Sequence, residues 1–313
     1  RSALCSPYRD MQLCGPPPSS SWLAVAMIMG ILERSPAFSK AGATDPDNWS
    51  LFAEAQRLAY ADRDHYVADS EAALVPVKGL LHPDYLALRA GKISTANASA
   101  DVMHGDPWAF DNIIPIDRGV DATRHAAGTT HFVVVDQQGD VVSMTASVES
   151  IFGSTRMVGG MFLNNQLTDF SFRAKDQQGK DIANAVAPGK RPRSSMSPTI
   201  MLDNEGEFLL ATGSPGGNSI IAYTAKSLVG VLDWGLSPQQ AVDLPNLVAR
   251  GNTVRIERDR ANKELIDGLR SYGLKVKESA GENSGLSMVM RHTDGQLEGG
   301  VDPRREGVIE LVY

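Results

Sequence analysis

The sequence has 313 residues, of which 42% are hydrophobic, and its formal net charge at pH 7 is −7. This length and composition suffice for one large domain or two ordinary ones with a substantial core. The negative charge and the scattered basic residues argue against nucleic-acid binding, because no basic stripe is present to neutralise phosphates. The longest strongly apolar run, residues 22–32, is too short to cross a bilayer, so we expect no membrane span in this chain.

The first segment contains the only two cysteines, Cys5 and Cys14. They could face each other across a small hairpin, where a disulfide would indicate an oxidising compartment. Two unrelated free thiols are an equally good interpretation, and neither spacing nor context supports a zinc site. After a proline-rich turn at residues 15–18, we expect residues 22–32 to form a buried helix, for which the preceding serines offer N-caps.

The chain changes character near residue 129. Before it, apolar spacing predicts a second helix over residues 48–66, and residues 76–121 are rich in loop-forming residues. After it come four strand-like runs, at residues 131–136, 140–148, 197–203 and 207–213. Further helices are expected over residues 218–234 and 261–272, and short strands, the last within residues 307–313, close the chain. Strands flanked by helices favour a layered domain.

The tetrapeptide Gly128-Thr129-Thr130-His131 stands directly before the first of these strands. A threonine hydroxyl needs a base to become a nucleophile, and a free α-amine with a pKa of roughly 8 supplies one at a chain end. Cleavage between Gly128 and Thr129 would create that chain end, and the glycine leaves the carbonyl sterically open. By itself, however, the tetrapeptide is more typical of a polar loop that enters a strand.

Longer motifs resolve this ambiguity. TTHFVVVDQQGDVVSMTASV, GGMFLNNQLTDFS, KRPRSSMSPTIML and ATGSPGGNSII resemble, in this order, the small subunit of γ-glutamyltranspeptidases. The upstream YRDMQLCGPPPSSS and AEAQRLAYADRDHY resemble the second half of that family's large subunit. The resemblance implies an α+β N-terminal-nucleophile hydrolase, a four-layer αββα sandwich whose precursor cleaves itself. Residues 1–128 would be the C-terminal part of the large subunit with its processing linker, and residues 129–313 the small subunit, intertwined in one domain.

The resemblance also implies the catalytic residues. Cleavage would fall between Gly128 and Thr129, and Thr129 would act as nucleophile with its own α-amine as base. Ser147 stands where the family often has a threonine whose hydroxyl assists the nucleophile. The positions of Gly216 and Gly217 carry the oxyanion hole, which suits glycines at the start of a helix. From the residues alone, a tight turn between a strand and a helix explains this glycine pair better.

A second set of residues is implied for substrate binding. Ser194 and Ser195 match the pair that holds the α-carboxylate of the γ-glutamyl group, although alone they would be read as turn caps. Asp169 matches the aspartate that binds the α-amine, and Gln166 matches a neighbouring contact to the same end of the substrate. Without the resemblance, these residues would be interpreted as a polar turn. Glu149 would strengthen amine binding; we expect it on the same strand face as the serine two residues before it.

Other polar residues are predicted to be structural. His131 is expected to be a strand histidine, because the α-amine makes a histidine base unnecessary. Residues 62–65 are read as a salt-bridge cluster at a helix end and not as metal ligands, and no metal or cofactor is expected. Residues 170–190 lack tyrosine and tryptophan, so we expect no aromatic lid over the pocket. The family's carboxylate-binding arginine precedes the proline-rich motif, so we expect it to come from outside the printed sequence.

The expected activity is transfer of the γ-glutamyl group of glutathione or related γ-glutamyl amides to water, amino acids or peptides. An acylase of the same fold acting on glutaryl or cephalosporin-type side chains is one alternative. An unprocessed, inactive homologue with a binding role is the other. The family resemblance, and weakly the cysteine pair, point to a periplasmic or extracellular location.

Overall fold

The computed structural model describes residues 1–35, 37–38, 42–123 and 128–311. Its centre is a six-stranded sheet in the order β1-β2-β7-β8-β12-β13, with every neighbouring pair antiparallel. The strands are β1 (Leu4–Tyr8), β2 (Met11–Gly15), β7 (Thr199–Leu202), β8 (Phe208–Gly213), β12 (Ser287–Arg291) and β13 (Leu297–Val301). Because β2 pairs with β7, the N-terminal hairpin belongs to the same sheet as strands from the second half of the chain.

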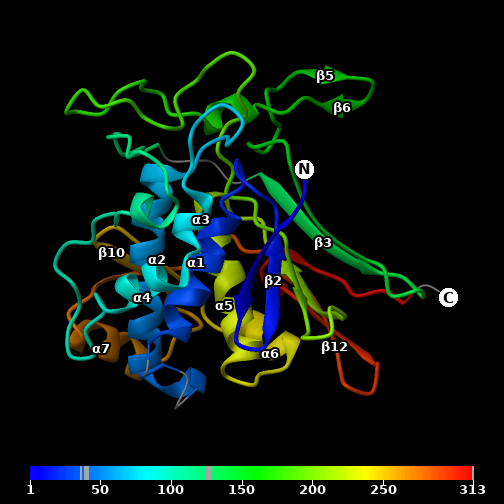
Figure 1. Ribbon diagram of the computed structural model, residues 1–313. Helices are drawn as coiled ribbons and strands as arrows, with labels where there is room; N and C mark the ends of the chain where they lie inside the picture. The colour runs from blue at the N-terminus through cyan, green and yellow to red at the C-terminus, as the bar shows by residue number, and fades with distance from the viewer. Residues whose placement is uncertain (36, 39–41, 124–127, 312–313) are drawn as a thin grey trace.

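Helices pack on one face of this sheet (Figure 1). They are α1 (Trp22–Glu33), α2 (Pro46–Tyr66), α3 (Val77–Leu80), α4 (Pro83–Ala90), α5 (Ile220–Leu232), α6 (Pro238–Asp243) and α7 (Lys263–Ser271). A smaller sheet of β9 (Leu247–Arg250), β10 (Thr253–Glu257) and β11 (Lys275–Ser279) packs beside α2 and α7. The apolar α1 is buried on all sides, as its composition predicts. Among the described residues, no helix has the length and apolar character to span a membrane.

A two-stranded ribbon of β3 (Thr129–Val135) and β4 (Val141–Ser147) packs on the other face of the sheet, against β8 and β12. In Figure 1, β3 lies on the opposite side of the molecule from α2 and α4, and the small hairpin of β5 (Met157–Val158) and β6 (Met161–Phe162) projects above it. The described layers are therefore helices, sheet and ribbon. The outward face of the ribbon carries four exposed apolar side chains: Phe132, Val134, Val142 and Met144.

Several local expectations need correction. The second helix begins at Pro46, because the Asp45 side chain caps it by accepting from the Asp47 amide. The region expected to be loops contains α3 and α4. Residues 307–311 form no strand: they follow a 3₁₀ turn over Pro303–Arg305, and Gly307 and Ile309 lie against β13 without pairing with it. At the start of α1, Ser20 and not Ser21 accepts the Trp22 amide.

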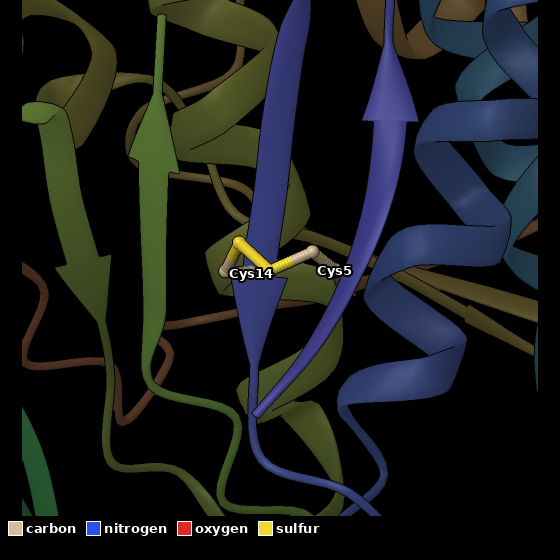
Figure 2. The surroundings of a disulfide bond; sticks show 2 residues. All are labelled: Cys5 and Cys14. Carbon is tan, nitrogen blue, oxygen red and sulfur yellow. A yellow bond between two sulfur atoms is a disulfide. The ribbon is translucent and has the colours of Figure 1, made fainter. Parts of the chain in front are cut away.

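The two cysteines form a disulfide, which settles the open choice between a disulfide and free thiols. Cys5 and Cys14 are directly paired residues of β1 and β2, with 4.1 Å between their Cα atoms. Figure 2 shows the bond crossing from one strand to the other. It closes the hairpin that forms one edge of the central sheet.

Replacing both cysteines by serine is expected to lower the free energy of unfolding by about 2.5 kcal/mol, because the unfolded chain loses the constraint of a roughly ten-residue loop. Equilibrium denaturation in urea measures this change. A reducing agent should destabilise the natural protein by a similar amount and leave the double variant unchanged. Equal unfolding midpoints for the two oxidised proteins would contradict the prediction.

Candidate active site

Thr129, the predicted nucleophile, is the first residue of β3 and lies opposite Ser147, the last residue of β4. The two side-chain oxygens are 3.0 Å apart, and the Thr129 side chain is nearly buried. The Ser147 hydroxyl also donates to the carbonyl oxygen of Gly128 at 3.2 Å and accepts from the Glu149 amide at 2.8 Å. The serine therefore contacts both sides of the Gly128–Thr129 peptide bond.

Gly128 is enclosed by backbone. A Cβ atom at this position would lie 2.5 Å from the carbonyl oxygen of Glu149 and 2.6 Å from the carbonyl group of Ser150. Backbone atoms cannot move aside as a flexible side chain can, so only glycine fits here. The sequence suggested that glycine leaves the carbonyl open, and the close approach of residues 149–150 gives a stronger reason for it.

Glu149 lines the site, but not for the predicted reason. β4 ends at Ser147, and Glu149 adopts a left-handed backbone with φ of 75°. The alternation of side chains along a strand therefore does not extend to this residue. The turn in the backbone, and not strand periodicity, brings the buried Glu149 side chain beside the serine.

Asp169 ends a short 3₁₀ turn over Gln166–Asp169 and is buried. The Gln166 amide donates to its carboxylate. Asn184, which is fully buried, donates to the Asp169 carbonyl oxygen at 2.8 Å and accepts from the Arg193 amide at 2.8 Å. The turn that carries Asp169 is thus tied to the segment that carries the serine pair.

Ser194 and Ser195 lie just before β7 and run beside the serine-rich segment that precedes α1. The Ser21 amide donates to the Ser194 carbonyl at 2.7 Å, and the Ser194 amide donates to the Ser19 carbonyl at 2.9 Å. The Ser195 hydroxyl donates to Asn218 Oδ1 at 3.2 Å and accepts from the guanidinium of Arg63 at 2.6 Å. Two motifs that are 175 residues apart in the printed sequence are therefore adjacent in space.

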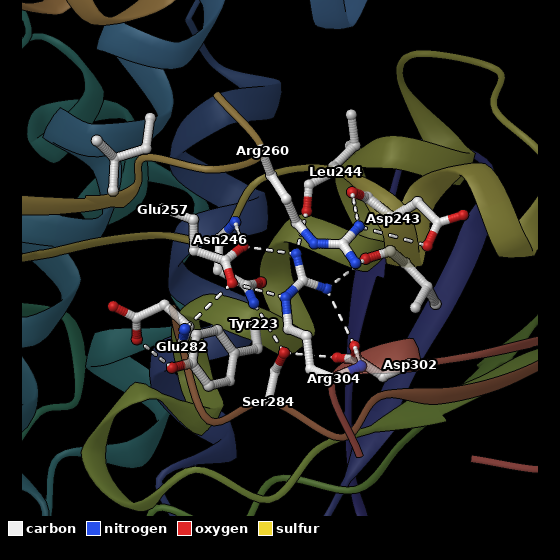
Figure 3. A network of polar contacts seen from close by, with 12 residues as sticks. Tyr223, Asp243, Leu244, Asn246, Glu257, Arg260, Glu282, Ser284, Asp302 and Arg304 are labelled. Atoms are coloured by element: carbon white, nitrogen blue, oxygen red, sulfur yellow. Dashed lines mark hydrogen bonds and ion pairs between the residues drawn. The ribbon is translucent and has the colours of Figure 1, made fainter. Parts of the chain in front are cut away.

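Gly216 and Gly217 form the turn between β8 and α5, with φ angles of 134° and 57°. A Cβ on Gly216 would lie 2.5 Å from the ring of Tyr223. The Tyr223 hydroxyl donates to Glu282. Next to this pair, Ser284, Asp302 and Arg304 form a network of polar contacts (Figure 3). The glycine turn therefore packs against a tyrosine whose hydroxyl is itself hydrogen-bonded.

Most of the predicted catalytic and substrate-binding residues line one cavity. Its volume is about 10 Å³, and its lining includes Thr129, Ser147, Glu149, Gln166, Asp169, Ser194, Ser195 and Gly217, together with Met196 and Ile220. Gly128 and Gly216 directly precede lining residues. None of residues 170–190 contributes to the lining. Among the residues that the structure describes, the lining carries two carboxylates and neither arginine nor lysine, so it suits a ligand with a positively charged group.

His131 lies outside this cavity and packs between the ribbon and the sheet. Its Nδ1 atom is 2.9 Å from the Thr145 hydroxyl, and its ring fills the space that a side chain at Gly213 would occupy. Burial lowers the pKa of His131 to about 4. The prediction of a structural histidine agrees with this position.

The stability of the protein is expected to fall as the pH drops from about 6.5 to 4. The unfolded chain binds a proton at His131 in this range and the folded chain does not, which corresponds to about 3 kcal/mol over the full interval. Denaturation at several pH values should show a shallower dependence for His131→Gln. Parallel curves for the two proteins would contradict this assignment, because other histidines contribute equally to both.

Asp62, Arg63 and Asp64 form ion pairs, as predicted: Asp62 pairs with Arg89, and Asp64 pairs with Arg63 and Arg250. His65 instead stacks on the ring of His104. The sequence did not reveal that Arg63 reaches Ser195. It also gave no indication that Arg305 donates to the Thr129 carbonyl oxygen at 2.8 Å. Both contacts join residues more than 130 positions apart, and no local pattern encodes them.

The chain is similar to known proteins over nearly its whole length. The family model described as gamma-glutamyltranspeptidase matches residues 1–312. A Bacillus subtilis protein named glutathione hydrolase proenzyme is 33% identical over 308 residues, which are 96% of this chain and 51% of that relative. A Pseudomonas protein named acylase ACY 1 proenzyme is 30% identical over 310 residues, which are 98% of this chain and 51% of that relative.

The crystal structure of cephalosporin acylase from Bacillus halodurans matches with a TM-score of 0.80 at 24% identity, and the match covers 97% of this chain and 51% of that chain. This likeness shows the fold, which is the α+β fold of N-terminal-nucleophile hydrolases. The chain spans about half the length of the relatives it matches. On the match to the family model over nearly its whole length, the chain belongs to the gamma-glutamyltranspeptidase family.

Proposed function

We propose that this chain carries the catalytic centre of an enzyme that takes the γ-glutamyl group from glutathione or related γ-glutamyl amides. The observation that carries the proposal is the single cavity that Thr129 shares with two carboxylates and a serine pair. An α-amino acid head group has one positive and one negative charge. Glu149 and Asp169 would bind its ammonium group, and the serine pair would bind its carboxylate.

The first step is self-cleavage. The Thr129 hydroxyl attacks the carbonyl carbon of Gly128, and the C–N bond breaks to give an ester between Gly128 and the threonine oxygen. Water hydrolyses this ester, which releases the Gly128 carboxylate and leaves Thr129 with a free hydroxyl and a free α-amine. The hydrogen bond from Ser147 to the Gly128 carbonyl, at 3.2 Å, is positioned to stabilise the negative charge that develops on that oxygen.

Turnover then uses the new chain end. The α-amine of Thr129 accepts the hydroxyl proton as the oxygen attacks the γ-carbonyl of the donor, and it returns the proton to the departing amine. The amides at Gly216 and Gly217 would hold the oxyanion. The γ-glutamyl ester on Thr129 is then hydrolysed by water or transferred to an amino acid or peptide, which predicts ping-pong kinetics. The chemistry requires no metal or cofactor.

On this proposal, residues 1–128 belong to a large subunit and residues 129–313 are the small subunit. Small molecules are the partners: glutathione or another γ-glutamyl amide as donor, and amino acids or peptides as acceptors. We place the protein in the periplasm or outside the cell, which the Cys5–Cys14 disulfide supports because such bonds persist in oxidising compartments.

A denaturing gel and N-terminal sequencing test the self-cleavage. From the printed sequence we expect fragments of roughly 14 and 20 kDa, taking about 110 Da per residue, and the 20 kDa fragment should begin Thr-Thr-His-Phe. A stable full-length band with no turnover would instead favour the inactive, binding homologue.

The acylase alternative is favoured by the likeness to ACY 1. Comparing γ-glutamyl and glutaryl anilides separates the two, because a glutaryl group lacks the amine. With Glu149 and Asp169 both lining the cavity, we expect the γ-glutamyl anilide to be preferred. A preference for the glutaryl anilide would replace the transferase assignment with the acylase one.

A further inference from the structure

Arg63 lies directly behind the serine pair. Its side chain is fully buried in the last turn of α2 and does not line the cavity. One terminal nitrogen donates to the Ser195 hydroxyl at 2.6 Å, Nε donates to the Ser21 hydroxyl at 2.9 Å, and the other terminal nitrogen pairs with Asp64 at 2.8 Å. The planar guanidinium thus connects the helix, the segment before α1 and the serine pair.

This guanidinium belongs to an arginine cluster formed by Arg63, Arg193 and Arg250. All three surround Asp64, and Arg193 also pairs with Asp121 at 2.9 Å. Burial lowers the pKa of Arg193 to about 9, which still leaves it protonated at neutral pH. Among the described residues, three guanidinium groups and two carboxylates therefore form the ion pairs beneath the serine pair.

This cluster of cations matters because the described part of the cavity lining holds two carboxylates and no arginine or lysine. The Ser195 oxygen accepts a hydrogen bond from Arg63, so its own hydrogen points to another acceptor, at present Asn218 Oδ1. A hydroxyl polarised by a buried cation is a stronger donor, and a charged acceptor benefits more from it than a neutral one.

We propose that Arg63 is a positioning residue that makes the Ser194–Ser195 subsite select a carboxylate over a neutral group of the same shape. It acts through Ser195 and does not touch the substrate. The inference rests on the proposed function, in which this subsite receives the α-carboxylate of the γ-glutamyl donor.

The test compares γ-glutamyl p-nitroanilide with the analogue whose α-carboxylate is a carboxamide. Arg63→Lys retains the charge but loses the planar guanidinium that donates to both Ser195 and Ser21. We therefore expect the preference for the carboxylate donor to fall about tenfold, the scale of one charged hydrogen bond. The loss should appear in KM, with kcat nearly unchanged. An equal loss for both donors, with the preference intact, would show that Arg63 is only structural.

Arg57→Lys is the matched control. Arg57 lies on the same helix, is buried and ion-paired with Glu54, and bonds to the Gly251 and Ser99 carbonyls away from the cavity. We expect this variant to keep the donor preference. A loss of preference as large as in Arg63→Lys would also overturn the inference, because it would reflect general loosening of α2.

Asp64→Asn gives a second variant in case Arg63→Lys does not fold. Removing this carboxylate leaves more of the cluster's positive charge unbalanced, so the preference for the carboxylate donor should increase. An unchanged or reduced preference would contradict the inference.

Calorimetric binding of L-glutamate and of its α-amide, isoglutamine, measures the same preference without any turnover, and the variants should fall in the same order. If the natural protein neither binds L-glutamate nor uses the anilide, the proposed function fails and the inference falls with it. Binding and turnover with no effect of these variants would reject the inference alone.

Discussion

Thr129→Ala is expected to remain a full-length chain and to lose turnover by about 10³-fold or more, because one residue supplies both the nucleophile and the base. Without the hydroxyl, nothing attacks the Gly128 carbonyl, and without cleavage no α-amine is released. A denaturing gel measures the first effect, and hydrolysis of γ-glutamyl p-nitroanilide measures the second.

Thr130→Ala is the matched control for this prediction. Thr130 is the next residue of β3, but its side chain is exposed on the outward face of the ribbon. We expect the Thr130→Ala variant to be cleaved and to turn over the γ-glutamyl donor as the natural protein does. Thr129→Ser, which keeps a hydroxyl, should recover part of both activities. A 20 kDa fragment or normal turnover from Thr129→Ala would refute the assigned nucleophile.

The strand that begins at Thr129 could be predicted from local sequence, whereas the assignment of Thr129 as the nucleophile required motifs spread along the whole chain. A run of β-branched residues predicted a strand over residues 131–136, and β3 begins two residues earlier, at Thr129. The helices with clear apolar spacing, α1, α2 and α5, were predictable for the same reason. Short-range patterns determine these elements, and tertiary contacts only reinforce them.

The misplaced features depend on contacts that the local sequence does not contain. Strand alternation predicted the face of Glu149, but the chain leaves β4 in a left-handed turn that alternation cannot represent. Residues 307–311 are apolar enough for a strand, yet after the preceding turn they lie against β13 without pairing with it. Arg63 was correctly read as a member of a salt-bridge cluster, while its contact with Ser195, 132 residues away, follows only from the packing of α2.

The glycine turn between β8 and α5 gives the second large expected effect. Gly216→Ala should lower kcat by about 10²–10³-fold, the usual consequence of losing one oxyanion donor. The added Cβ would meet the Tyr223 ring at 2.5 Å, and a φ of 134° is strained for any residue other than glycine. The amide at this position must therefore shift away from the developing oxyanion. Because self-cleavage could slow as well, kcat is to be expressed per cleaved molecule, counted by N-terminal sequencing.

Gly206→Ala separates this effect from the general cost of placing alanine at a positive φ. Gly206 has a φ of 86° in the turn between β7 and β8, and a Cβ atom added there would meet nothing within 4 Å beyond its own chain neighbours. This variant should lose some stability and keep its kcat. If Gly216→Ala folds, is cleaved and turns over within tenfold of the natural protein, the turn does not hold the oxyanion. The two variants together therefore distinguish a site that needs a particular amide direction from a fold that merely needs two flexible residues.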